Sequence, residues 1–75
     1  MGAQKGRAVY DFAPDAHVAE AMVGLPIAEV ERTLILATLR QTNGNRTRAA
    51  QILGLSIRTV RNKLKDYADK GFNIP

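Results

Sequence analysis

The chain has no cysteine among its 75 residues, and aromatic residues make up only 5% of it. The absence of cysteine excludes disulfides, thiolate metal sites and thiol nucleophiles. Because small secreted domains usually depend on disulfides, it also favours a cytoplasmic protein. No apolar run approaches the roughly 20 residues that span a bilayer, and the N-terminus has no apolar segment typical of a signal peptide. We therefore expect no membrane association.

A chain of this length has room for one small domain. Hydrophobic residues form 45% of the sequence, so an aliphatic core is expected. Most catalytic pockets need a larger scaffold, and the sequence contains neither a phosphate-binding loop nor a cluster of histidine with acidic residues. We expect neither an enzyme nor a bound cofactor or metal.

Acidic residues are missing between Glu31 and Asp66. Residues 25–75 hold nine basic and four acidic residues, a net charge of +5, whereas residues 1–24 have a net charge of −1. A basic surface without interspersed carboxylates favours a polyanionic partner, nucleic acid before acidic lipid. The alternative is a solvated basic face. The basic residues of the acid-free stretch are Arg32, Arg40, Arg46, Arg48, Arg58, Arg61, Lys63 and Lys65.

The N-terminal part of the chain shows no sustained helical or strand periodicity. We assign residues 1–24 to a linker or flexible tail. A short helix is compatible with residues 15–23 inside it. The folded domain is then expected over residues 25–75.

The spacing of apolar residues predicts a long first helix from Pro26 or Ile27 to about Thr42, ended by Asn43 and Gly44. Its apolar residues fall on more than one face, whereas an ordinary surface helix has a single apolar stripe. One face would pack on the chain's own domain and another on a second copy, which predicts a homodimer. The alternative is a central helix buried within a monomer. The predicted dimer interface consists of Ile27, Val30, Leu34, Ile35 and Leu39.

Two shorter helices are predicted after the long one. The first covers about residues 47–53, with Asn45 or Arg46 at its beginning. The second begins after Ser56, a favourable N-cap, and runs to about Asp69. The sequence therefore predicts an all-α fold, a helical bundle whose last two helices form a helix-turn-helix.

The residues around the turn between these two helices fit a helix-turn-helix for physical reasons. Ala50 is small enough to let the two helices cross closely. Gly54 can adopt the positive φ that ends a helix within one residue. Leu55 and Val60 would anchor the last helix on the bundle. The motif is moderately specific alone, and the adjacent basic stretch strengthens it.

In a helix-turn-helix the N-terminal part of the second helix enters the major groove of DNA. Arginine can pair with guanine and asparagine with adenine through two hydrogen bonds. The predicted base contacts are Ser56, Arg58, Thr59, Arg61 and Asn62. Residues near the preceding helix N-terminus and further along the last helix would meet phosphates. The predicted phosphate contacts are Asn45, Arg46, Thr47, Arg48, Lys63 and Lys65.

Residues from about Gly24 to Asp69 resemble the Fis-type C-terminal domain of the NtrC class of bacterial enhancer-binding proteins. The resemblance is carried by the segments AEVER (28–32), LI (34–35), GNRTRAA (44–50), ILGLS (52–56) and RTVRNKL (58–64). It implies a Fis-like bundle that dimerises through the long first helix. It also implies binding to palindromic enhancer sites in double-stranded DNA upstream of sigma-54 promoters. Within that class, the sequence is most similar to a flagellar regulator.

In such activators a central AAA+ ATPase contacts sigma-54 RNA polymerase, and no phosphate-binding loop of that kind occurs in these residues. The resemblance therefore implies that this chain is the C-terminal part of a larger regulator that acts in the bacterial nucleoid. This part would bind DNA but would not activate transcription by itself. Two alternatives remain. The chain could be a dimerisation or protein-interaction module, or a nucleoid protein like Fis itself.

Overall fold

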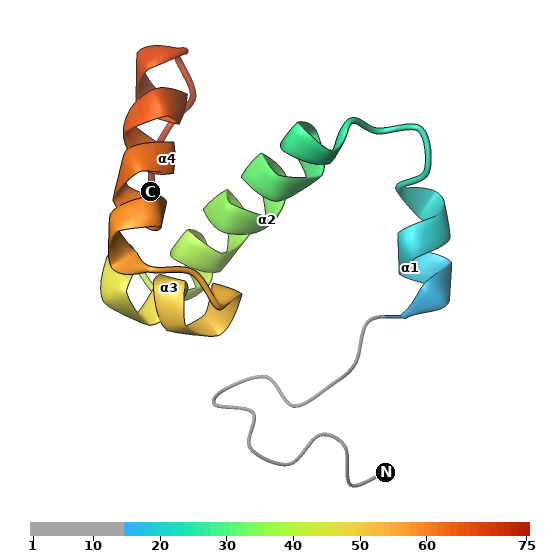
Figure 1. The fold of residues 1–75 in the computed structure, drawn as a ribbon, viewed down its shortest axis with the longest axis horizontal. Helices are drawn as coiled ribbons and strands as arrows, with labels where there is room; N and C mark the ends of the chain where they lie inside the picture. The colour runs from blue at the N-terminus through green and yellow to red at the C-terminus, as the bar shows by residue number, and fades with distance from the viewer. Residues whose placement is uncertain (1–14) are drawn as a thin grey trace, which may run out of the picture.

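The computed structural model describes residues 15–75, which form four helices and no strand (Figure 1). The all-α prediction is confirmed for this part of the chain. The helices are α1 (Ala16–Ala21), α2 (Ile27–Gln41), α3 (Arg46–Leu53) and α4 (Ile57–Asp69). Most of the predicted N-terminal linker, residues 1–14, lies outside the described residues.

Local capping explains the bounds of α2. Pro26 lies just before the helix in an extended conformation, and its carbonyl accepts hydrogen bonds from the amides of Glu29 and Val30. The helix ends one residue earlier than predicted because the chain turns left-handed at both Asn43 (φ 55°) and Gly44 (φ 83°). The amide of Gly44 then donates to the carbonyl of Leu39 at 2.9 Å.

The side chain of Asn45 caps α3 by accepting the amide hydrogen of Arg48 at 3.0 Å, so α3 begins at Arg46. At the other end Gly54 has a φ of 71° and the amide of Leu55 donates to the carbonyl of Ala50 at 3.0 Å. The predicted left-handed stop at Gly54 is confirmed, and it turns the chain within a few residues into α4.

The core lies where α3 packs against both α2 and α4. The centre of the core is fully buried, since Leu39, Ala49 and Val60 are 0% exposed. Ala50, at the crossing of α3 and α4, is also buried, in agreement with the prediction that this position must be small. Partly buried Ile74 folds back onto the same cluster after α4. The core consists of Ile35, Leu39, Ala49, Ala50, Val60, Leu64 and Tyr67.

The core corrects part of the predicted dimer interface. Ile35 and Leu39 are 1% and 0% exposed within a single chain, because they face α3 and α4. Neither residue offers surface to a second copy. Ile27 and Leu34, by contrast, are 82% and 57% exposed, and Val30 is half-buried.

The N-terminal half of α2 lies away from this core, and α1 stands apart beyond it (Figure 1). α1 contains no buried residue, and Val18 is 57% exposed. Between residues 15 and 75, no helix combines the length and the apolar character needed to cross a membrane.

Candidate nucleic-acid interface

The first turn of α4 is held by a side-chain cap at its exposed N-terminus. The Oγ of Ser56 accepts the amide hydrogen of Thr59 at 3.0 Å. The Ser56 hydroxyl also donates to the Thr59 hydroxyl at 2.9 Å. The remaining free amides and the positive end of the helix dipole favour an anion at this position.

Three of the predicted base contacts lie on the solvent side of the N-terminal half of α4. Arg58, Arg61 and Asn62 are exposed, while Val60 and Leu64 on the opposite side are buried. None of the three makes a side-chain hydrogen bond or ion pair with another residue of the described chain. Their donors and acceptors are therefore free to meet a ligand.

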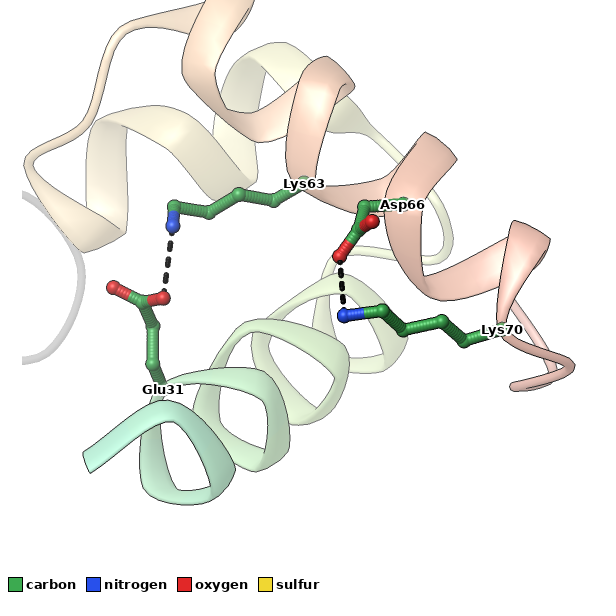
Figure 2. Close-up of polar contacts among 4 residues, drawn as sticks. All are labelled: Glu31, Lys63, Asp66 and Lys70. Atoms are coloured by element: carbon green, nitrogen blue, oxygen red, sulfur yellow. Dashed lines mark hydrogen bonds and ion pairs between the residues drawn. The ribbon is translucent and has the colours of Figure 1, made fainter. Parts of the chain in front are cut away.

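The C-terminal half of α4 differs because it carries its own acids. Asp66 pairs with Lys70 at 3.0 Å, as Figure 2 shows, and Asp69 pairs with Lys65 at 3.6 Å. These carboxylates balance the nearby ammonium groups. The unbalanced positive charge of α4 is thus concentrated towards its N-terminal half.

Lys63 is directed towards α2 and away from the exposed face of α4. Its Nζ lies 2.8 Å from Oε1 of Glu31 (Figure 2). This hydrogen bond is the main reason that the pKa of Lys63 is raised above its ordinary value. The predicted phosphate contact at Lys63 therefore meets a competing carboxylate already in place, which the spacing of the sequence did not reveal.

The beginning of α3 brings further predicted phosphate contacts close to α4. Arg46 donates from Nη1 to the carbonyl of Gly44 at 2.8 Å. It lines a shallow depression together with Arg61 and Lys65 of α4. Arg48 donates to Oε1 of Gln51 at 3.0 Å, and Thr47 is exposed. The side-chain oxygen of Asn45 accepts the capping hydrogen bond from the Arg48 amide described above.

A contact between α2 and the end of the chain also escaped prediction from the sequence. The guanidinium of Arg32 lies 4.1 Å from the ring centroid of Phe72. The same ring meets Tyr67 edge-on, with centroids 6.5 Å apart. Burial raises the pKa of the Tyr67 hydroxyl above its ordinary value.

In the described part of the chain, no three residues of the histidine, cysteine, aspartate and glutamate types come together as potential metal ligands. The geometry instead defines a class of protein. Two short helices joined at a left-handed glycine, with a capped and cationic second helix, form a helix-turn-helix, a DNA-binding motif.

Comparison with known proteins places this motif in a family. Residues 26–67 match the family described as bacterial regulatory proteins of the Fis family, more than half of the chain. The chain belongs to the Fis family of bacterial regulatory proteins, and the resemblance inferred from the sequence is confirmed.

Two relatives illustrate the range of this similarity. Transcriptional regulatory protein FlbD of Caulobacter vibrioides is 57% identical over 64 residues, which cover 85% of this chain and 14% of that protein. DNA-binding protein Fis of Proteus mirabilis is 49% identical over 43 residues, which cover 57% of this chain and 44% of that protein. The chain thus spans less than half the length of either relative. No solved structure matches it.

Proposed function

We propose that this chain is the operator-recognition module of a bacterial transcription regulator and that it binds double-stranded DNA through α4. The observation that carries the proposal is the exposed set of Arg58, Arg61 and Asn62, which lack protein partners among the described residues. Their side chains suit the edges of guanine and adenine in the major groove. Ser56 and Thr59 complete the predicted base contacts at the helix N-terminus.

Phosphate contacts would flank this surface and set the register of the protein on the duplex. Arg46 and Lys65, which line the same depression as Arg61, are the best placed. Asn45, Thr47 and Arg48 lie around the N-terminus of α3, where the helix dipole favours an anion. Lys63 and Lys65 each have a carboxylate partner, Glu31 and Asp69, which a DNA phosphate would have to replace.

A homodimer would bring two such surfaces together on a palindrome. The exposed side of α2, with Ile27 and Leu34, supports an interface between two copies, with Val30 at its edge. Two α4 helices would then enter successive major grooves of the duplex, about 34–36 Å apart. The name DNA-binding protein Fis and the helix-turn-helix geometry support the binding of DNA by each copy.

The similarity to FlbD supports a more specific role. The chain would recognise a palindromic enhancer of a sigma-54 promoter that controls flagellar genes, in the bacterial nucleoid. Contact with sigma-54 RNA polymerase would depend on an AAA+ domain in another part of the protein. The chain itself would bind DNA and carry out no reaction.

A titration with selected DNA tests this proposal. Duplexes that bind the chain are enriched from a random-sequence pool, and the best symmetric site is compared with a scrambled duplex at two salt concentrations. Tighter binding to the symmetric site, with two chains per duplex and a strong salt dependence, supports the proposal. Absence of binding to any duplex at low salt would instead favour a protein-interaction module, whose surface would be the exposed apolar side of α1 and α2.

A further inference from the structure

The two halves of α2 are attached to the rest of the chain in different ways. Ile35 and Leu39, its core residues, lie in the C-terminal half. The N-terminal half contributes nothing to the core. Away from α3, α2 and α4 diverge as the two arms of a V (Figure 1).

Two side-chain contacts link the arms of this V. Glu31 of α2 binds Lys63 of α4 at 2.8 Å (Figure 2). Its neighbour Arg32 lies over Phe72, whose ring meets Tyr67 of α4. Between the arms is a groove of about 260 Å³ lined by charged residues of both helices, so apolar packing does not fill the space.

We propose that Glu31 and Arg32 are positioning residues that hold α4 at a fixed angle to the N-terminal half of α2 and thereby set the half-site spacing that a dimer of this chain prefers. The inference rests on the proposed function, in which α2 carries the dimer contact and α4 enters the DNA. Neither residue needs to touch DNA in order to act.

The angle between α2 and α4 matters because of where the proposed dimer contact lies. Ile27 and Leu34, the exposed large apolar residues of α2, are on the half that lacks core packing. A change of angle between that half and α4 is doubled by two-fold symmetry and moves both α4 helices. Since half-sites must match the helical repeat of DNA, a looser angle makes several spacings nearly equivalent.

Each contact is individually weak, because exposed ion pairs and exposed cation–π contacts each correspond to a factor of only about two to five in an equilibrium. They therefore suit adjustment of an angle better than stabilisation of the fold. The side chains of Glu31 and Lys63 are 46% and 32% exposed, so loss of the pair leaves no buried charge behind.

The test measures binding to symmetric duplexes whose half-sites are separated in single base-pair steps. The variants are Glu31→Gln, Phe72→Ala and their combination. Lys63→Met removes the other partner of the ion pair with Glu31 and is combined with Glu31→Gln. Glu29→Gln is the matched control, because it removes the same charge from α2 where no hydrogen bond or ion pair to another described residue is lost. Thermal unfolding of each variant checks that the fold remains.

We expect a single preferred spacing for the unmodified chain and for Glu29→Gln. Glu31→Gln and Phe72→Ala should each reduce the preference over the adjacent spacings by about two- to five-fold, and more together. Lys63→Met should add little to Glu31→Gln. Equal weakening of DNA binding at every spacing, or an unchanged dependence on spacing, would overturn this inference but not the proposed DNA binding. An unmodified chain that binds no duplex, or shows no preferred spacing, would overturn the proposed dimeric DNA binding itself.

Discussion

Ser56 and Thr59 are joined twice across the first turn of α4, through a 3.0 Å hydrogen bond from the Thr59 amide to Ser56 Oγ and a 2.9 Å contact between the two hydroxyls. One serine thus serves two purposes. It satisfies a backbone amide at the helix N-terminus, and it fixes the polar side chains at the point where α4 would meet DNA.

The two roles of Ser56 can be separated by substitution. Ser56→Ala removes the cap and should reduce the free energy of unfolding by about 1 kcal/mol. Ser56→Asp retains a capping oxygen and should keep most of that stability, but its negative charge should weaken DNA binding more than Ser56→Ala does. Thermal unfolding and duplex titration measure the two effects. If Ser56→Asp bound DNA as tightly as the unmodified chain, the N-terminus of α4 would not lie near phosphates.

Base and phosphate contacts should respond differently to alanine substitution. Arg58→Ala or Asn62→Ala should cost about 1–3 kcal/mol of binding to the selected site and relax its base preference. Lys65→Ala should weaken binding to all sequences alike and reduce the slope of log K against log salt by about 1. Competition titrations against single-base variants of the site separate the two patterns. A sequence-selective loss for Lys65→Ala would reverse its assignment.

The dimer contact can be tested without disturbing the core. Leu34 is 57% exposed in the single chain, so Leu34→Asp should leave the fold intact. It should dissociate the dimer, because an unpaired carboxylate is costly to bury in an interface. Sedimentation measures the mass, with Thr33→Asp, which places the same charge at the exposed neighbouring position, as the control. A Leu34→Asp chain that keeps the dimer mass would place the interface on another face.

The turn of the helix-turn-helix depends on backbone conformation alone. Gly54 has a φ of 71°, yet a Cβ added there would meet no atom within 4 Å. Gly54→Ala should therefore cost about 1–2 kcal/mol of unfolding free energy through the left-handed backbone only. Gly54→Asn should cost less, since asparagine adopts this region more readily. Equal losses for the two variants in denaturant unfolding would point to a steric cause instead.

Short-range features of the fold were predictable because they depend on neighbours in the sequence. The caps at Asn45 and Ser56 and the left-handed turn at Gly54 each arise within a few residues. The apolar stripe of α4, with Val60 and Leu64 buried, follows from the helical repeat. The bounds of α2, α3 and α4 accordingly agree with the predicted ones to within about one residue, whereas α1 ends two residues before the end of the short helix predicted over residues 15–23.

The buried face of the long first helix could not be predicted from the sequence. Its periodicity indicated two apolar faces but could not say which one the chain would bury itself. Packing of α3 against α2 and α4 decided that Ile35 and Leu39 face inward and that Ile27 and Leu34 stay exposed. Two of the five predicted interface residues were therefore misplaced, because a helical repeat sets angles around one axis and not the identity of the partner.

The sequence by itself determined the class of fold, the helix-turn-helix and the exposed cations of α4, since these depend on composition and on spacings shorter than two helical turns. Only the tertiary structure decided the surroundings of Lys63 and the relation between α2 and α4. The ion pair from Lys63 to Glu31 joins residues 32 positions apart. Such a contact exists only once the core has set the two helices at their mutual angle, and no local pattern encodes that angle.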